Sequence, residues 1–430
     1  MSVINSAMVP DVAARSGTPW SQARQTVYEA GFAERMDPVS LRLGSADGTT
    51  LADDLRAQAA LPAFPTASVD GFAVRGAGPW RLTGQILAGQ VAGELGSDGT
   101  AAAVATGAMV PADAEAIIRT EDAIAVDGLI AGSPRSKREW RSAGEEARPG
   151  DVLVSAGTPV TPATLGLAAA CGYDSLRVRP RPRAAVVISG DELLVSGPPR
   201  GGNIRDALGP QIPGWLARLG ADLPASSGIC LARDDLDSHL AAITQALDAQ
   251  ADIIVFTGGT MHGPADYLRV ALGRLNASYV VDTVQCRPGR PMLLAIVPSA
   301  DGRRTLLAGL PGNPVPAVIA LLTLVGPAIC GLTGRPLADL PAIELGAPIP
   351  SRAENAHLAL VHRDCDGRAR PFGRASSSVL RDLARAVGFA VIGPHQPAAE
   401  GDQVPLIALP VLPGEMLFAF RSTSESALTT

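Results

Sequence analysis

Continuous apolar runs alternate with stretches of helical spacing through the middle of the chain. The apolar runs occupy 184–188, 252–256, 279–284, 292–297 and 305–307, and the helical patterns occupy 211–219, 236–247, 264–275 and 315–332. Strands that are apolar throughout are typical of a parallel sheet covered by helices on both faces. We therefore predict a doubly wound α/β domain over residues 181–334, with any ligand at the carboxyl ends of its strands.

The chain before this domain has a different pattern. Residues 61–135 are rich in Gly, Ala and Thr and contain only short apolar runs, which predicts a β-rich module. Helices are predicted after Thr18 and after Thr161, each followed by Pro, since Thr is a frequent N-cap and Pro suits the first helical position. If the second helix returns the chain to the first, residues 61–135 are an insertion in a domain built from 1–60 and 136–180.

The C-terminal part, residues 335–430, returns to short strands and Pro turns with one helical patch at 378–387. This pattern predicts a second β module. The uncharged segment before it is apolar, but Pro316, Gly326 and Pro327 interrupt it, so we expect a buried helix of a globular domain and no membrane span.

Composition narrows the function classes. The chain has 430 residues, 47% hydrophobic, with a formal net charge of −6. That balance gives no electrostatic footprint for nucleic acid, and the apolar content excludes a chain that is disordered over most of its length. The five Cys have no paired spacing, so neither a zinc site nor a disulfide framework is supported, and a reducing cytoplasm suits them. The start of the chain lacks the basic and apolar regions of a secretory signal.

Three Gly-containing loops follow strands of the predicted α/β domain. They are 189–192 (Ser-Gly-Asp-Glu), 257–263 (Thr-Gly-Gly-Thr-Met-His-Gly) and 310–314 (Leu-Pro-Gly-Asn-Pro). Glycine lets backbone approach a ligand, and amides at a helix N-terminus bind anions. Any one such loop is also a plain turn, but the three together favour a site for a phosphate-bearing ligand.

Charged residues near these loops suggest the ligand's chemistry. Glu192 and Asp266 would suit a hard cation such as Mg²⁺, and Arg287 and Arg290 would grip oxyanions. In the β-rich module, Asp70 precedes a Gly and a strand, and Thr106 lies in a tight turn. Local turn capping is the favoured reading of those two residues when the sequence is considered alone.

Several ordered motifs resemble those of the molybdopterin molybdenumtransferase family, the molybdenum insertases related to the gephyrin E domain. The matching segments are 61–74 around Ser68-Val-Asp70-Gly71, 106–111 (Thr-Gly-Ala-Met-Val-Pro), 141–146, 189–193, 258–267, 287–291 (Arg-Pro-Gly-Arg-Pro), 309–314 (Gly-Leu-Pro-Gly-Asn-Pro) and 377–393. The resemblance runs from about residue 19 to residue 410, which is nearly the whole chain.

The resemblance implies an elongated, multidomain α/β plus β subunit that forms a homodimer with shared active sites. Its parts would be a split N-terminal domain, the inserted β-rich module, a molybdopterin-binding α/β domain and a small C-terminal β barrel. It implies a transferase that converts adenylylated molybdopterin and molybdate into molybdenum cofactor, AMP and water with Mg²⁺. The adenylyltransferase of the preceding step would be a further partner.

The resemblance also implies a role for each site residue. Loops holding the pterin and its phosphate would contribute Ser189, Gly190, Asp191, Gly258, Gly259, Thr260, Asp266, Pro311, Gly312, Asn313 and Pro314. The cation and adenylate phosphates would be held by Glu192, Asp234 and Asp266, and molybdate would be attracted by Arg287 and Arg290. Asp70 and Thr106 of the partner subunit would complete the site.

The chain departs from the family pattern at several positions. Arg287 and Arg290 replace a Lys pair, 260–262 (Thr-Met-His) replaces Val-Ser-Val, Leu208 stands where Asn is usual, and Glu146 replaces Asp. These departures raise an alternative, a catalytically weak paralogue that carries molybdopterin or its cofactor, or regulates its use. The related adenylyltransferase would need only the α/β domain, and a gephyrin-like scaffold would need an interaction tail.

Overall fold

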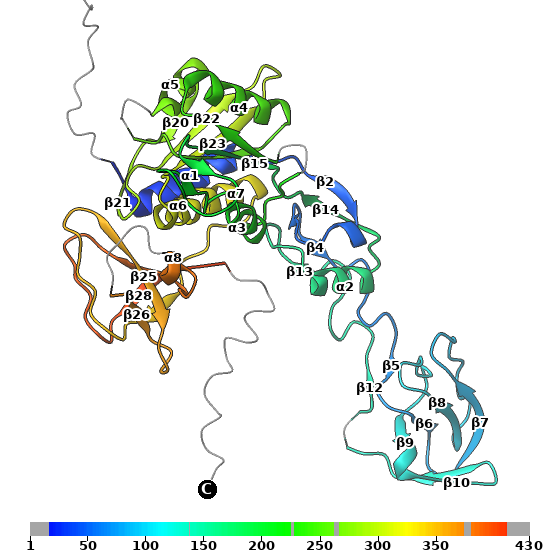
Figure 1. The fold of residues 1–430 in the computed structure, drawn as a ribbon. Coiled ribbons are helices and arrows are strands. Elements are labelled where there is room, and N and C mark those ends of the chain that lie inside the picture. The colour runs from blue at the N-terminus through cyan, green and yellow to red at the C-terminus, as the bar shows by residue number, and fades with distance from the viewer. Residues whose placement is uncertain (1–16, 137, 225–227, 262–265, 374–379, 411–430) are drawn as a thin grey trace, which may run out of the picture. The chain divides into compact units, whose positions relative to one another are not determined.

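The computed structural model describes residues 17–136, 138–224, 228–261, 266–373 and 380–410 (Figure 1). They form two compact units. One comprises the described parts of 1–37 and 179–430, and the other comprises the described parts of 38–178.

The first unit is built around a six-stranded sheet with the order β18-β15-β19-β23-β22-β20. Its strands are β15 (Ala184–Ser189), β18 (Ile229–Ala232), β19 (Ile253–Thr257), β20 (Ser278–Val281), β22 (Leu293–Pro298) and β23 (Arg304–Leu310). The first four strands of this order are parallel, whereas β22 runs antiparallel to both of its neighbours. The sheet is therefore mixed, because the short turn from Pro298 to Arg304 permits a hairpin but not the crossover that a parallel pair needs.

Helices cover both faces of this sheet, as the apolar runs predicted. They are α1 (Trp20–Ala33), α3 (Ile212–Leu219), α4 (Leu236–Asp248), α5 (Tyr267–Arg274), α6 (Pro314–Ala320) and α7 (Gly326–Thr333). Successive residues of β15 alternate between two cores: Val186 packs with α1, α3, α6 and α7, while Val187 packs with α4 and α5. Because both faces of β15 are buried, none of its side chains reaches solvent, which explains the continuous apolar sequence at 184–188.

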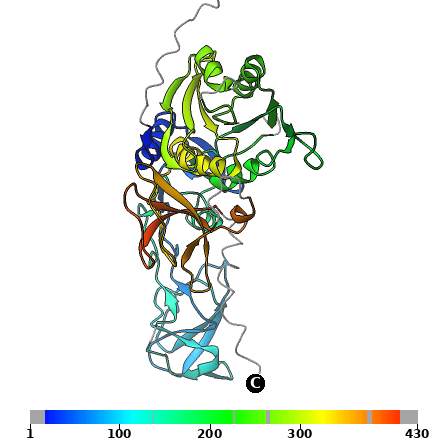
Figure 2. The same ribbon diagram turned by 60° about the vertical axis from the view of Figure 1, so that its left-hand side comes forward.

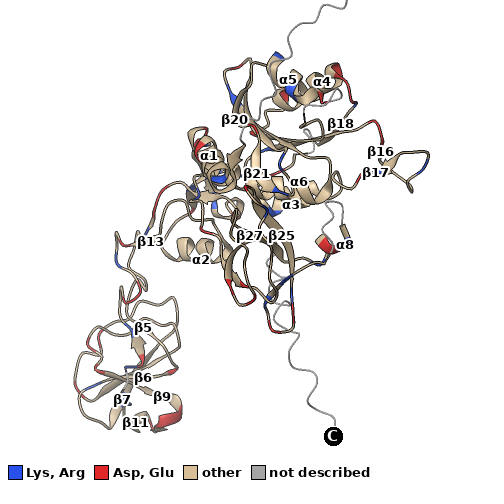
Figure 3. Ribbon diagram, turned by 90° about the vertical axis from the view of Figure 1, so that its left-hand side faces the viewer, with Lys and Arg blue, Asp and Glu red and all other residues tan. Residues whose placement is uncertain are grey.

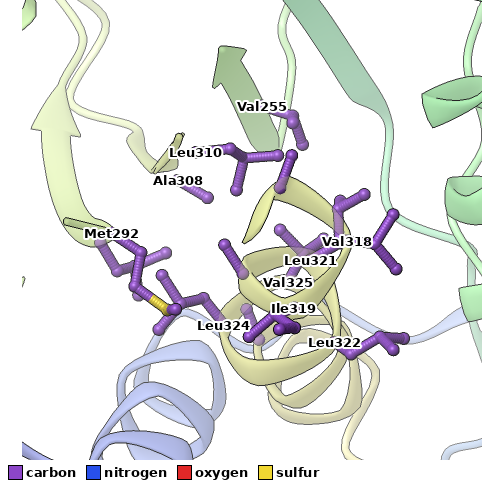
Figure 4. Close-up of a cluster of buried hydrophobic side chains, with 14 of the residues drawn as sticks. Val255, Met292, Ala308, Leu310, Val318, Ile319, Leu321, Leu322, Leu324 and Val325 are labelled. Carbon is purple, nitrogen blue, oxygen red and sulfur yellow. The ribbon is translucent and has the colours of Figure 1, made fainter. Parts of the chain in front are cut away.

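The longest apolar segment is the core helix of this unit. Helices α6 and α7 are joined by the π-helical segment η3 (Leu321–Val325), and side chains of β19 and β23, among them Val255, Ala308 and Leu310, lie on one side of this helix (Figure 4). Pro314–Thr333 is long and apolar enough to cross a membrane, but 89% of its most apolar window is buried in the molecule. It carries no charged residue and is tan along α6 in Figure 3, as expected of a helix in a folded core.

Helix α1 differs from the sequence-based expectation in two ways. It packs against α7 within the α/β unit, although residues 1–60 were assigned to the split N-terminal domain. Thr18 is not its N-cap, because Thr18 and Pro19 form a short strand, β1, that pairs with β21 (Val284–Arg287), and helix α1 begins at Trp20. The indole of Trp20 donates to Thr323 Oγ1 at 3.1 Å, which anchors the start of the helix to η3.

The second sheet of this unit joins the C-terminal segment to the α/β domain. Its order is β1-β21-β25-β27-β28-β24, with β26 beside β25; the C-terminal strands are orange to red in Figure 2. In sequence β21 lies between β20 and β22 of the α/β sheet, and in this second sheet it pairs with β25 of the C-terminal segment. The remaining elements are β24 (Ala342–Glu344), β25 (Ala356–Arg363), β26 (Ala369–Pro371), α8 (Leu380–Leu383), β27 (Gly388–Ile392) and β28 (Gln403–Ala408), together with the small pair β16 (Leu193–Leu194) and β17 (Ile204–Arg205). This path of strands does not close, so the β module is a half-barrel. The predicted helical patch at 378–387 is helical over α8, and residues 378–379 lie outside the described residues.

The second unit contains the insertion. Its elements are β2 (Val39–Arg42), η1 (Leu43–Ser45), β3 (Thr50–Leu51), β4 (Leu55–Arg56), β5 (Thr66–Ala67), β6 (Gly71–Arg75), β7 (Trp80–Ile86), β8 (Thr100–Val104), β9 (Ala116–Arg119), η2 (Thr120–Asp122), β10 (Ala123–Val126), β11 (Leu129–Gly132), β12 (Trp140–Arg141), β13 (Val152–Val154), α2 (Pro162–Ala170) and β14 (Ser175–Arg179). Strands β2 and β4 pair with β14 and β13, so chain on one side of the insert pairs with chain on the other. The insert itself is a six-stranded sheet of order β10-β11-β7-β8-β6-β9.

Helices α1 and α7 cross at a contact between glycines. A Cβ added to Gly331 would lie 2.4 Å from Tyr28 O and 2.5 Å from Phe32 N, and one added to Gly31 would lie 2.5 Å from Ala328 O. No side chain fits between these backbones. The crossing therefore fixes α1 on the α/β domain.

We expect Gly331→Ala to destabilise this unit by roughly 1–3 kcal/mol, because the new methyl group must push α1 away. Thermal unfolding measures the change. The matched control is Gly273→Ala in α5, where a Cβ meets nothing within 4 Å, so the higher helix propensity of Ala should leave stability unchanged or raised. Equal stability of wild type and Gly331→Ala would contradict the proposed crossing.

Candidate active site

Two of the predicted loops meet at the carboxyl ends of neighbouring strands β15 and β19. Gly258 has φ +84°, and a Cβ on it would lie 3.2 Å from Ser189 O. Gly259 has φ +61°, and its added Cβ would lie 4.0 Å from His239 Cε1. Only glycine adopts this backbone without strain, so the Gly-Gly pair lets the second loop lie directly against the first.

The third loop is attached to the second. Gly258 N donates to Leu310 O at 2.9 Å, which ties the end of β19 to the end of β23. Pro311 is buried, Gly312 and Asn313 are exposed, and Pro314 begins α6. Asn313 occupies the N-cap position, as predicted, but its side chain makes no capping hydrogen bond, so its amide is not committed to the helix.

Ser189 lies at the centre of a buried polar cluster. Its hydroxyl is 2.8 Å from Asp234 Oδ1 and 2.8 Å from His239 Nε2. Asp234 Oδ2 also accepts from the Asp191 N–H at 3.2 Å. The neighbouring Asp235 is the N-cap of α4 and accepts from Ser238 N at 2.7 Å, so the two adjacent acids have separate tasks.

The acids predicted to hold a cation are not gathered into a metal site. Glu192 is exposed and its Oε2 lies over Gly190, 2.8 Å from where a Cβ would be, while Asp266 is the N-cap residue of α5. Among the residues that the structure describes, no group of three or more His, Cys, Asp or Glu side chains could hold a metal ion. Mg²⁺ usually binds through one or two carboxylates and substrate phosphates. The acids therefore fit a cation that arrives with a phosphorylated ligand, not one held by the protein alone.

A cavity of about 900 Å³ opens beside the third loop. Its walls include Pro311 and Asn313, the Arg287–Pro291 segment and the half-barrel sheet. Arg287 and Arg290 thus share a cavity with the Pro-Gly-Asn-Pro loop, and their binding of an oxyanion stays a prediction. The described residues of the loops at Ser189 and Gly258 do not line this cavity, and the Gly258 loop is joined to the cavity's loop by the hydrogen bond from Gly258 N to Leu310 O.

The half-barrel contributes cavity residues that sequence reasoning missed. Arg352 and His357 line the cavity together with Phe372. His357 Nδ1 lies 2.7 Å from Pro350 O and donates to that carbonyl, which leaves Nε2 as the acceptor of a neutral ring. Burial lowers the pKa of His357, which favours that neutral form. These residues belong to no motif, and only the β21–β25 pairing brings them to the Arg287 loop.

Asp70 and Thr106 form a contact of their own in the second unit. Asp70 Oδ1 accepts from Thr106 N at 2.6 Å and from Thr106 Oγ1 at 2.8 Å. These bonds lower the pKa of Asp70, so the carboxylate is ionised at neutral pH. Both residues are exposed. The local capping that the sequence favoured is present, and it presents an oriented, charged carboxylate to solvent.

Three family descriptions match consecutive parts of the chain. Residues 18–172 match the MoeA N-terminal region (domain I and II), residues 185–330 a probable molybdopterin binding domain, and residues 342–409 the MoeA C-terminal region (domain IV). The molybdopterin molybdenumtransferase of Staphylococcus aureus is 32% identical over 313 residues, covering 70% of this chain and 72% of that protein. The chain belongs to the molybdopterin molybdenumtransferase family. This is a family of transferases of molybdenum cofactor biosynthesis.

Other relatives agree. The molybdopterin molybdenumtransferase of Synechococcus elongatus is 33% identical over 284 residues, 63% of this chain and 69% of that protein. Two structures of the molybdopterin biosynthesis MoeA protein from Pyrococcus horikoshii superpose with TM-scores of 0.72, at 24% and 21% identity. They cover 91% and 90% of this chain and 99% and 98% of those chains, which shows the same fold. The family expectation drawn from the motifs is thereby confirmed.

The cavity geometry makes a prediction about oxyanion binding. We expect Arg290→Gln to weaken binding of a tetrahedral oxyanion such as molybdate by about 10- to 100-fold, because a charge-assisted hydrogen bond contributes about 1.5–3 kcal/mol. Arg290→Lys, which restores the usual family residue, should retain most of the affinity. Isothermal titration calorimetry with molybdate measures the affinity of each variant.

The control for this change is Arg218→Gln on α3, an exposed arginine that does not line the cavity. Its affinity for molybdate should equal that of wild type. An equal loss in Arg218→Gln and Arg290→Gln would mean that net charge, and not the cavity, sets the affinity.

Proposed function

We propose that this protein transfers molybdenum from molybdate to adenylylated molybdopterin, releasing AMP. The observation that carries the proposal is the junction at Pro311–Asn313, where the strand-end loops with their acids meet a cavity containing Arg287, Arg290 and Arg352. A phosphoanhydride and an oxyanion need different surroundings. The strand-end loops supply the first and the arginine-lined cavity supplies the second, and the two adjoin at Pro311–Asn313.

The strand-end loops suit the phosphorylated substrate. The Gly258–Gly259 segment presents no side chain beside the end of β15, so a pterin or a phosphate would meet its main chain. The N-terminal amides of α5 would favour an anion. Asp234 and Glu192 would hold Mg²⁺ together with the phosphates. When bound, Mg²⁺ would neutralise phosphate charge and polarise the phosphoryl group.

The arginine cavity suits molybdate. Guanidinium groups stay charged at any physiological pH and offer several fixed N–H donors to oxyanion oxygens. The overall reaction takes adenylylated molybdopterin, molybdate and a proton to molybdenum cofactor, AMP and water. Cleavage of the anhydride bond makes the transfer favourable, and these protein residues bind and orient both reactants without forming a covalent intermediate.

An AMP-release assay tests this function directly. Purified protein is incubated with adenylylated molybdopterin, molybdate and Mg²⁺. We expect Glu192→Gln and Asp234→Asn to lower the rate by at least about 10- to 100-fold, the range seen when groups around a metal ligand are changed. Asp235→Asn is the matched control, because Asn also caps helices and Asp235 contacts α4 and not Ser189.

The same assay separates the two functions considered from the sequence. Wild-type protein that binds adenylylated molybdopterin but releases no AMP with molybdate would contradict the transferase proposal and favour a carrier or regulator. Omitting Mg²⁺ should abolish AMP release. Adding Mg²⁺ back should restore it.

We further propose that the site is shared within a homodimer, with Asp70 and Thr106 of the partner subunit completing it. The support is the exposed, oriented Asp70 carboxylate, which has no catalytic partner other than Thr106 among the described residues of its own unit.

Mixed dimers test the shared site. Asp70→Ala and Glu192→Gln protomers should each be inactive alone. If each site takes Asp70 from the other subunit, unfolding and refolding them together should restore about a quarter of wild-type activity, since half of the dimers are mixed and one site in each is intact. No recovery, with mixed dimers shown by mass spectrometry, would place Asp70 in the same subunit's site.

A further inference from the structure

A buried imidazole lies beneath the strand-end loops and has no task in the reaction as described. His239, on α4, has no exposed surface and packs edge-on against Phe256 with ring centroids 4.9 Å apart. Its Nε2 is 2.8 Å from Ser189 Oγ. Its Nδ1 is buried and has no hydrogen-bond partner among the described residues.

The directions of these hydrogen bonds follow from their partners. An ionised carboxylate can only accept, so the single proton of the Ser189 hydroxyl is donated to Asp234 Oδ1. The Ser189 oxygen must then accept from His239, which therefore carries its proton on Nε2. A neutral imidazole has one N–H, so Nδ1 is bare, in agreement with its lack of an acceptor. A second proton on Nδ1 would be buried without a partner, which is costly.

This arrangement excludes a hydrolytic role for Ser189. A nucleophilic serine needs a histidine that accepts its proton, whereas here the histidine donates to it. Ser189 instead passes the fixed orientation of the imidazole on to Asp234. The Asp191 N–H holds the other carboxylate oxygen at 3.2 Å. Each oxygen keeps a lone pair for a further ligand.

We propose that His239 is a positioning residue, which acts through the Ser189 hydroxyl to hold the Asp234 carboxylate in the orientation that receives the substrate's divalent cation. This inference rests on the proposed function, because the cation is expected to arrive with the phosphates of adenylylated molybdopterin. Partners in the outer shell of metal ligands commonly act in this way.

Packing offers a competing explanation that the experiment must separate. The Gly259 backbone rests near His239 Cε1, and Tyr267 lies 6.1 Å from the imidazole between ring centroids. An apolar residue at position 239 could fill this space without the hydrogen-bond relay from His239 through Ser189 to Asp234. The positioning explanation requires Ser189 and the proton on Nε2, whereas the packing explanation requires neither.

The test compares His239→Gln, whose amide can donate from nearly the position of Nε2, with His239→Leu, which cannot donate. Binding of Mn²⁺ in the presence of AMP is measured by electron paramagnetic resonance. We expect His239→Leu to weaken Mn²⁺ binding by about 10- to 100-fold and His239→Gln to restore most of it. His395→Gln, at an exposed histidine, is the matched control and should bind as wild type does.

A double-mutant cycle then shows whether the effect passes through Ser189. In a Ser189→Ala background, His239→Leu should cause little further loss, because the relay is already broken. The same loss from His239→Leu in both backgrounds, or equal damage by His239→Gln and His239→Leu, would overturn the proposal in favour of packing. Thermal unfolding of each variant identifies losses that come from misfolding.

The tautomer of His239 in the wild-type protein is an independent test. A long-range ¹H–¹⁵N spectrum with His239 assigned should show a proton on Nε2 and a bare Nδ1, and a proton on Nδ1 would overturn the relay even if a variant fails to fold. Failure of the proposed function is distinguishable, since it appears as wild-type protein that neither binds Mn²⁺ with AMP nor releases AMP. If only this inference fails, the wild-type protein binds Mn²⁺ with AMP normally. Residue 239 then affects that binding only through packing, with equal losses in His239→Gln and His239→Leu.

Discussion

The candidate site depends on how closely the loop after β19 approaches the end of β15. At Gly258 a side chain would meet the carbonyl of Ser189, and its positive φ suits glycine. Neighbouring strands of a sheet are only about 4.8 Å apart, so loops leaving them compete for the same space. The Gly-Gly pair resolves that competition by removing side chains from one loop. Ser189 itself stays buried there, and its hydroxyl contacts the partly buried carboxylate of Asp234.

The cavity next to this edge arises from a shared strand. β21 lies between β20 and β22 of the α/β sheet in sequence and pairs in parallel with β25 of the half-barrel, with Arg287 opposite His357. Because the pairing ends at Arg287, the following Pro-Gly-Arg-Pro segment must leave the sheet where the two domains meet. Its arginines therefore enter a cavity whose other wall is the half-barrel. Strand β1 extends the same sheet by pairing with β21, and helix α1, which follows it directly, is held by its glycine crossing with α7. Together they tie the start of the described chain to this junction.

Much of the fold could be predicted because its signals are local. Thr161 caps α2 by accepting from Thr164 N at 3.2 Å, and the buried strands have the apolar runs that two covered faces require. Thr18 carried the same cap signal and was misleading, because pairing with β21 outweighed it. The apolar runs predicted a parallel sheet, but β22 is antiparallel to both of its neighbours. The composition of a strand does not indicate the direction in which it pairs.

The site could be predicted only in part. The loop motifs pointed to Ser189 and Arg290, whose roles stay predictions. The family resemblance implied Asp234, and the structure places that residue against Ser189, 45 positions away in sequence. Arg352 and His357 are brought to the cavity by long-range pairing and carry no local signal. His239 was missed because one histidine on the apolar face of a helix looks like any core residue. Its buried hydroxyl contact is visible only once β15 and α4 are packed together.

A crystal structure of the protein soaked with Mn²⁺ and AMP would test the central claim most directly, since manganese is located by its anomalous scattering. The account predicts an anomalous peak about 2.0–2.2 Å from carboxylate oxygens of Asp234 or Glu192, with the AMP phosphate as a further ligand next to the Gly258–Gly259 backbone. Manganese and AMP bound together elsewhere on the molecule, with this edge of the sheet free of both, would contradict it.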